Sequence, residues 1–199
     1  MENTVQTNKS LTIGIQGGMG SFNEQATLHH LAVNQVTDYE VHYLYTTEKV
    51  LASLSNGTVD LGLFAIHNSV GGIVHESIKA IGRYNFQIQD EVVIPIRHFL
   101  MKLPDSQTEE IQRIMAHPQV FAQCRTTLHQ RYPKLDKQSG QDDLIDTARA
   151  AQALRNGEIP NHTAILGPQR LAELYNFEII DQDLQDDHPN NTSFLLVRK

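Results

Sequence analysis

Short apolar runs rich in β-branched residues alternate with amphipathic stretches along most of the chain. The first run, Leu11–Ile15, leads into a glycine-rich turn over residues 17–20 and then into a helical pattern over Phe22–Val33. A strand over residues 41–45, a helix over 47–54 and a buried strand over 59–66 are predicted in the same way. This alternation is typical of the α/β class, in which a mostly parallel sheet carries helices on both faces.

A long β-branched run over residues 91–101 contains Pro95. Because proline lacks a backbone N–H, this run suits a strand that crosses between two lobes better than the centre of a sheet. We therefore predict two Rossmann-like lobes joined by crossing strands, with residues 11–90 and 176–199 in lobe 1 and residues 91–175 in lobe 2. Residues 1–10 are predicted to be a flexible N-terminus, and the acidic polar stretch 182–191 a mobile loop.

The elements of lobe 2 are predicted from the same signals. Its strands are expected over residues 113–116, 135–137 and 163–166, and its helices are expected to start near Pro118, Asp142 and Pro168. Two further strands, over residues 177–181 and 193–198, are expected to return to lobe 1.

Composition and charge exclude several classes of protein. The chain has 199 residues, 40% of them hydrophobic, but no apolar run of about eighteen residues and no apolar leader at its start. We therefore expect a cytoplasmic protein with no membrane partner, and the single cysteine, Cys124, fits a reducing compartment. The net charge of −7 and the scattered basic residues argue against a nucleic-acid partner. No cluster of histidine and cysteine has the spacing of metal ligands, so no metal site is expected.

Polar or glycine-rich segments follow four of the predicted strands. They lie at residues 17–21, 67–69, 117–119 and 167–168, and each opens a helix or a turn. Ligands of open α/β sheets bind at the carboxyl ends of the strands, where helix N-termini present unpaired N–H groups and a positive potential. The pattern predicts a two-lobed protein that binds a small anion. The alternative for each segment is a helix cap or turn without a ligand.

Several short motifs, taken together in their order along the chain, resemble the catalytic domain of the prephenate dehydratase family. The resemblance extends from Ile13 to Val197, and it implies a two-lobed architecture like that of type II periplasmic binding proteins. Its most specific part is the His117-Pro118-Gln119 turn followed by Gln123-Cys124. The other matching segments are residues 17–26, 65–69 with Gly72 and Val74, 147–151, and 191–194, where the family's threonine is kept as Thr192.

The resemblance also implies an activity. The family removes carbon dioxide and the ring hydroxyl of prephenate together, giving phenylpyruvate, and it uses no metal and no organic cofactor. By resemblance Thr192 is the proton donor to the leaving hydroxyl. The expected partner is thus a small-molecule dicarboxylate, bound by Gly20, Ser21, His67, Asn68, Ser69, His117, Gln119, Thr147 and Asn191, with backbone N–H groups near Gly20 and Ser21 as further donors.

Simpler interpretations of two of these residues stay open. Thr192 is also a β-branched residue of the kind that strands favour. His117 precedes a proline, so its side chain is alternatively a cap for the helix that follows.

The chain departs from the family pattern at four positions of the expected site. Ser21 replaces the usual threonine, His67 a glutamate, Gly167 a serine and Ser193 an arginine. A hydroxyl cannot replace the bidentate contact that a guanidinium makes with a carboxylate. A protonated His67 would restore part of the lost positive charge in a new place, so we expect a diverged member with weaker affinity for prephenate or a changed ligand.

Three functions therefore compete. The first is a prephenate dehydratase, a homodimer acting in phenylalanine biosynthesis without the regulatory ACT domain, because no chain follows Lys199 to form one. The second is a lyase that decarboxylates prephenate but keeps the ring hydroxyl, and the retained Thr192 argues against it. The third is a non-catalytic small-anion-binding protein, in which Thr192 binds the ligand and donates no proton to a leaving group.

Overall fold

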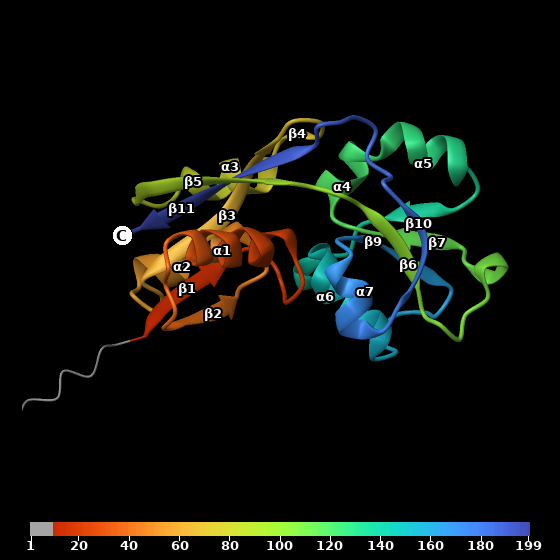
Figure 1. Ribbon diagram of the computed structural model, residues 1–199, viewed down its shortest axis with the longest axis horizontal. Coiled ribbons are helices and arrows are strands. Elements are labelled where there is room, and N and C mark those ends of the chain that lie inside the picture. The colour runs from red at the N-terminus through yellow and green to blue at the C-terminus, as the bar shows by residue number, and fades with distance from the viewer. Residues whose placement is uncertain (1–9) are drawn as a thin grey trace, which may run out of the picture.

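Two β-sheets, each covered by helices, lie at opposite ends of an elongated molecule (Figure 1). The structure, a computed structural model, describes residues 10–199, so the predicted flexible N-terminus lies outside the described residues except for Ser10. The strand order is β2-β1-β3-β11-β5 in the first sheet, with β4 paired to β3, and β10-β6-β9-β7-β8 in the second. The α/β class and the two-lobed architecture are therefore confirmed.

The bounds of the elements follow the predicted alternation closely. The first sheet contains β1 (Leu11–Ile15), β2 (Tyr39–Tyr43), β3 (Leu61–Asn68), β4 (Gly72–Ile73), β5 (Gln87–Pro95) and β11 (Asn191–Arg198). The second contains β6 (Phe99–Lys102), β7 (Arg113–Met115), β8 (Asp136–Gln138), β9 (Thr163–Gly167) and β10 (Glu178–Gln182). The helices are α1 (Phe22–Val33), α2 (Thr47–Ser55), α3 (His75–Ile81), α4 (Pro118–Gln123), α5 (Arg125–Arg131), α6 (Thr147–Arg155) and α7 (Arg170–Tyr175), with short 3₁₀ turns η1 (Thr108–Glu110) and η2 (Asp142–Ile145).

Both sheets are mixed, whereas the sequence pattern predicted mostly parallel ones. β1 runs parallel to β2 and β3, but β11 runs antiparallel to both of its neighbours, β3 and β5. In the second sheet β7 is parallel to β8 and β9, and β6 is antiparallel to β9 and β10. The C-terminal strand thus lies inside the first sheet, and its register places Thr192 opposite Asn68 of β3.

Each sheet buries side chains on both of its faces. Consecutive residues of β3 show this, because Leu63 packs into one apolar cluster and Phe64 into another on the opposite face. Leu100 and Met101 of β6 divide in the same way between the two clusters of the second lobe. Strands covered on both sides are rigid supports, so the loops at their ends are held in place.

The boundary between the lobes differs from the prediction. β5 pairs with β11 from Gln87 to Pro95, so the whole of this strand belongs to lobe 1 and the chain crosses after Pro95. β10 pairs with β6, so the strand expected over residues 177–181 extends lobe 2 and does not return to lobe 1. The apolar pattern shows that a strand exists, but it does not show which sheet edge the strand joins.

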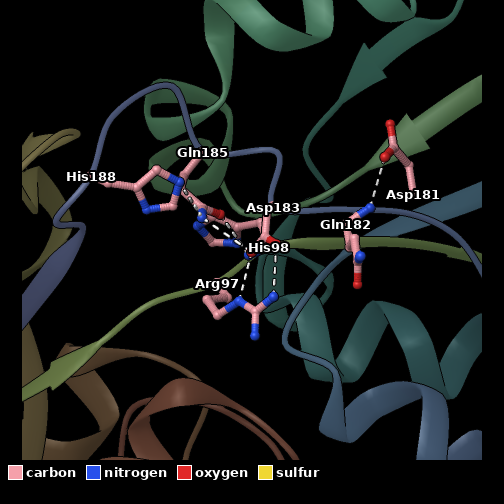
Figure 2. Close-up of polar contacts among 7 residues, drawn as sticks. All are labelled: Arg97, His98, Asp181, Gln182, Asp183, Gln185 and His188. Carbon is pink, nitrogen blue, oxygen red and sulfur yellow. Dashed lines mark hydrogen bonds and ion pairs between the residues drawn. The ribbon is translucent and has the colours of Figure 1, made fainter.

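The segment between β10 and β11, predicted to be a mobile loop, is a packed second crossing between the lobes. Leu184, Gln185 and Asn190 are all buried in it. Figure 2 shows the two crossing segments side by side, with the Arg97 guanidinium donating to both carboxylate oxygens of Asp183 at 2.6 and 2.7 Å. The acidic composition suggested disorder, but Asp183 and Gln185 bond to the other crossing segment. Asp186 accepts from the backbone N–H groups of Thr126 and Thr127 at the start of α5.

Among the helices of residues 10–199, none combines the length and the hydropathy that a membrane span requires.

Truncating Phe64 tests the core of lobe 1. Its ring is fully buried and meets Phe86 edge to face at 6.2 Å. Phe64→Ala should lower the free energy of unfolding by about 3–5 kcal/mol, measured by urea denaturation. As a control, Ile78→Ala on the exposed side of α3 should change it by less than about 0.5 kcal/mol. A comparable loss in the two variants would contradict the assigned core.

Candidate active site

A cavity lies between the two lobes, at the carboxyl ends of strands from both sheets. β1, β3, β7 and β9 all end at it or beside it, as expected for a ligand site of α/β sheets. Its apolar wall includes Phe22, Ile96 and Phe194, and its polar lining comes from both lobes. The polar lining residues are Gln16, Ser21, Asn23, Tyr45, His98, His117, Gln119, Gln123, Asp146, Thr147 and Thr192.

Five of the residues predicted for the site line this cavity. They come from four separate segments: Thr192 from β11, Ser21 from the start of α1, His117 and Gln119 from the start of α4, and Thr147 from the start of α6. The structure therefore brings together residues that are up to 171 positions apart in the sequence, from Ser21 to Thr192.

The other five predicted residues do not line the cavity. Asn68 is buried directly behind Thr192, and Asn191 precedes Thr192 on β11. Ser69 is exposed, and its hydroxyl oxygen accepts a hydrogen bond from the backbone N–H of Asn191. His67 is exposed on the face of β3 opposite to Asn68, so its imidazole cannot supply positive charge to the cavity. Gly20 packs against α7, outside the lining.

Thr192 has its hydroxyl held from behind. Its side chain is 6% exposed, and Oγ1 accepts a hydrogen bond from Nδ2 of Asn68 at 2.9 Å. No residue among 10–199 accepts a hydrogen bond from this hydroxyl. The oxygen therefore acts as acceptor toward Asn68, and the proton is left for a group in the cavity.

Three helices begin at the cavity, which gives it the positive ends of three helix dipoles. Each N-terminus is capped by a side chain: Ser21 for α1, His117 for α4 and Asp146 for α6. For His117 this confirms the alternative interpretation as a cap, because its Nδ1 accepts from the backbone N–H of Gln119 at 3.1 Å. These dipoles matter because no lysine or arginine occurs among the described residues that line the cavity.

Two backbone donors expected to face a ligand are already engaged. The N–H of Gly20 donates to a carboxylate oxygen of Glu24 at 2.7 Å, and the N–H of Ser21 donates to the carbonyl of Gly18 at 3.1 Å. They close the turn before α1, as its glycine-rich sequence requires. Of the groups expected to donate from this turn, the hydroxyl of Ser21 remains.

The two histidines of the lining are neutral. Burial removes the water that would stabilise an imidazolium, and it lowers the pKa of both His98 and His117 to about 4. Neither ring provides a cationic partner for a carboxylate near neutral pH. They contribute as hydrogen-bonding groups and as part of the wall, where the ring of His98 meets Phe22 edge to face at 5.4 Å.

Asp146 is a site residue that the sequence reasoning missed. Its carboxylate caps α6, and Oδ1 accepts from the N–H groups of Arg149 at 2.8 Å and Gly18 at 3.0 Å. Burial nevertheless raises the pKa of this carboxyl to about 6, because desolvation outweighs those bonds. The signal in the sequence was its place directly before the helix that starts at Thr147, which reads as an ordinary N-cap.

A second, half-buried carboxyl lies near Asp146. Glu76 accepts from the backbone N–H of Thr47 at 2.7 Å and from the side chain of Gln16, and burial raises its pKa as well. Asp146 and Glu76 repel each other, which also raises the pKa of Asp146. The cavity thus combines positive helix ends with one partly ionised carboxyl.

Comparison with known proteins shows what the chain is similar to. A sequence profile of the family described as prephenate dehydratase matches residues 13–199. Arogenate dehydratase/prephenate dehydratase 6, chloroplastic, of Arabidopsis thaliana is 33% identical over 140 residues, which cover 70% of this chain and 33% of that protein. Arogenate dehydratase/prephenate dehydratase 2, chloroplastic, of the same plant is 28% identical over 196 residues, covering 98% of this chain and 48% of that protein. The chain spans less than half the length of these relatives.

Solved structures agree with these relatives. The prephenate dehydratase of Arthrobacter aurescens, crystallised in complex with L-Phe, superposes with a TM-score of 0.77 at 26% identity, covering 95% of this chain and 60% of that chain. A lipoprotein of Bacillus subtilis superposes with a TM-score of 0.51 at 12% identity, covering 95% of this chain and 83% of that chain. At such low identity the second match shows the fold alone, which is the architecture of type II periplasmic binding proteins.

The raised pKa of Asp146 makes stability depend on pH. In the folded state the Asp146 carboxyl keeps its proton up to about pH 6, whereas in the unfolded state it loses the proton near its ordinary pKa of 3.8. The contribution of Asp146 to the free energy of unfolding therefore falls as pH rises from 3.8 to about 6. Asp146→Asn keeps a capping oxygen and cannot ionise. The free energy of unfolding of the variant relative to the parent should therefore increase by about 1 kcal/mol between pH 5 and pH 8, measured by urea denaturation. A difference that stays constant with pH would show that the carboxyl is not perturbed.

Proposed function

Because the chain belongs to the prephenate dehydratase family, we propose that it is a carbon–oxygen lyase of phenylalanine biosynthesis. Its reaction removes carbon dioxide and the ring hydroxyl from prephenate and leaves an aromatic ring. The observation that carries this proposal is the Thr192 hydroxyl, which lines the cavity between the lobes while Asn68 donates to its oxygen from behind.

In the reaction that we propose, the loss of carbon dioxide and the loss of the ring oxygen occur together. The bond between the ring and the leaving carboxylate breaks, its electron pair forms a ring double bond, and the bond to the ring oxygen breaks at the same time. Thr192 donates its proton to that oxygen, which leaves as water, and solvent later returns a proton to Thr192. The Asn68 N–H stabilises the negative charge that develops on Oγ1, and aromatisation provides the driving force.

The carboxylates of the substrate are held by neutral groups in this proposal. The hydroxyls of Ser21 and Thr147 and the amide of Gln119 line the cavity at three helix N-termini, whose partial positive charges attract anions. Ser193, which stands where the family has an arginine, does not line the cavity and pairs with His67 instead. Without a guanidinium, we expect weaker binding of a dianion than a bidentate arginine would give.

Asp146 favours a second substrate, arogenate, which is named in several of the relatives. Arogenate carries an ammonium group where prephenate carries a keto group. An ionised Asp146 in a cavity without lysine or arginine among its described lining residues attracts an ammonium and repels a dianion. The same proton donation by Thr192 applies to either substrate.

Further proposals concern the setting of the reaction. We place the enzyme in the cytoplasm, supported by the buried, unpaired thiol of Cys124. We also propose a homodimer, supported by the apolar side chains of Ile88 and Val93 that β5 leaves exposed at the edge of the first sheet.

Removing the hydroxyl of Thr192 tests its proposed role. Thr192→Ala should lower kcat by about 10²–10⁴-fold with little change in KM, because the proton is needed only as the C–O bond breaks. Thr192→Ser should keep most of the activity. Turnover is followed by the ultraviolet absorption of phenylpyruvate in alkali. Ser193→Ala, on the neighbouring position outside the cavity, serves as the matched control and should behave like the parent.

An alanine variant with the kcat of the parent would reject Thr192 as the acid. A non-aromatic dihydro product from the parent would instead indicate decarboxylation with the hydroxyl retained. Unchanged prephenate and arogenate would favour a binding protein without catalysis.

The charge of Asp146 gives the two substrates opposite pH dependences. With a pKa of about 6, the carboxyl is mostly neutral at pH 5 and mostly ionised at pH 7.5. As pH rises through this window, KM should increase for prephenate and decrease for arogenate, with the uncatalysed rate subtracted. Both changes should be lost in Asp146→Asn. Identical pH profiles in parent and variant would show that Asp146 does not meet the substrate.

A further inference from the structure

A row of buried polar side chains connects the two lobes and ends at Thr192. It consists of His98 on the first crossing segment, Gln123 at the end of α4, Asn190 on the second crossing segment, and Asn68 at the end of β3. All four are at most 4% exposed. We refer to these four residues as the hinge network.

The hydrogen bonds of this network have fixed directions at its first amide. Oε1 of Gln123 lies 2.8 Å from Nε2 of His98 and 2.9 Å from Nδ2 of Asn190. A carbonyl oxygen only accepts, so the proton of the neutral His98 ring must be on Nε2. The other end of the Gln123 amide donates to the backbone carbonyl of Gln119 at 3.1 Å, which prevents the amide from flipping.

The directions are equally fixed at the end of the row. Asn68 Oδ1 accepts from the backbone N–H groups of Val70 at 3.0 Å and Gly71 at 2.6 Å. Its Nδ2 must therefore be the donor, and its two N–H bonds face three acceptors: Asn190 Oδ1 at 2.6 Å, Thr192 Oγ1 at 2.9 Å and the backbone carbonyl of Asn191 at 3.1 Å. Each amide of the network thus has a single orientation, and together they make the Thr192 oxygen an acceptor.

One atom of the network is unsatisfied. Nδ1 of His98 is buried and has no hydrogen-bond partner among residues 10–199, while the ring itself lines the cavity. A buried polar atom without a partner costs stability, so stability alone would favour an apolar residue at this position. The other ring nitrogen, Nε2, explains why an imidazole stands at this position, because it orients the amide of Gln123.

The hydrogen bonds of the hinge network also depend on the position of one lobe relative to the other. His98 and Asn190 come from the two crossing segments, which are joined further by the backbone N–H of His98 donating to Gln185 at 3.0 Å. Figure 2 shows His98 and Gln185 beside the Arg97–Asp183 ion pair at this crossing. A shift of one lobe against the other would change the bonds between Gln123 of lobe 2 and Asn190.

We propose that His98, Gln123, Asn190 and Asn68 are positioning residues. They hold the Thr192 oxygen as an acceptor toward lobe 1. The proton of the Thr192 hydroxyl is then directed into the cavity, but only when the two lobes are correctly placed. This inference rests on the proposed function of Thr192. It predicts that a residue outside hydrogen-bond contact with Thr192 controls proton donation through the amides between them.

A pair of His98 variants tests the coupling. His98→Gln keeps an N–H donor near the place of Nε2, whereas His98→Leu removes it. His98→Leu should lower kcat at least about tenfold with KM within a few-fold of the parent, and His98→Gln should recover most of that loss. Thr163→Val, which removes a fully buried hydroxyl outside the cavity and the network, is the control and should keep the kcat of the parent. Far-ultraviolet circular dichroism checks that each variant is folded.

A double-mutant cycle separates positioning from a general loss of structure. Residues that act as a unit are not additive, so His98→Leu should have almost no further effect on kcat in a Thr192→Ala background. The same fold-loss in both backgrounds would overturn the proposal, because His98 would then act independently of Thr192.

Nuclear magnetic resonance tests the network without turnover. In the parent, the ring nitrogens of His98 should report a neutral Nε2–H tautomer from pH 5 to pH 8, and three-bond couplings of Thr192 should report one χ1 rotamer. Asn190→Asp, which puts an acceptor opposite Gln123 Oε1, should disturb both. An Nδ1–H tautomer or an averaged Thr192 rotamer in the parent would overturn the network, whereas a parent with these signatures that converts neither prephenate nor arogenate would reject only the proposed function.

Discussion

The antiparallel pairing of β11 between β3 and β5 is the constraint on which the site depends. This pairing brings the last strand of the chain into the middle of lobe 1 and sets Thr192 opposite Asn68. Because side chains alternate along a strand, Thr192 and Phe194 face the cavity while Ser193 does not. A shift of one residue in this register would place a neighbour of Thr192 opposite Asn68 and turn the Thr192 side chain to the other face of the sheet.

The cavity recognises charge in an indirect way. Helix ends provide its positive potential, both lining histidines are neutral, and the ionisable carboxyl of Asp146 opposes a dianion. The electrostatic balance is therefore small and depends on pH. We expect the selectivity between keto and amino substrates in such a site to depend on the protonation of Asp146, while the chemistry proposed for Thr192 is common to both.

The sequence predicted most elements and the pair of lobes, because periodicity and capping residues are local signals. α1 begins where Ser21 caps it, and the run over residues 91–101 does cross between the lobes, although only after Pro95. The errors concern long-range pairing, which periodicity does not encode: β10 joins lobe 2, and the polar stretch expected to be mobile is packed at the hinge. Similarly, the motifs located Thr192, Ser21 and Thr147, but Asp146 and His98 gain their character only from burial in the folded protein.

The proposed catalysis requires that the Thr192 hydroxyl meets the oxygen that leaves the substrate ring. A crystal structure with a bound, unreactive prephenate analogue that retains the ring hydroxyl would show whether it does. We expect the ring oxygen within about 2.6–3.2 Å of Thr192 Oγ1, with Asn68 still donating to the same atom. A ring oxygen directed away from Thr192, or a Thr192 hydroxyl bonded elsewhere, would contradict it.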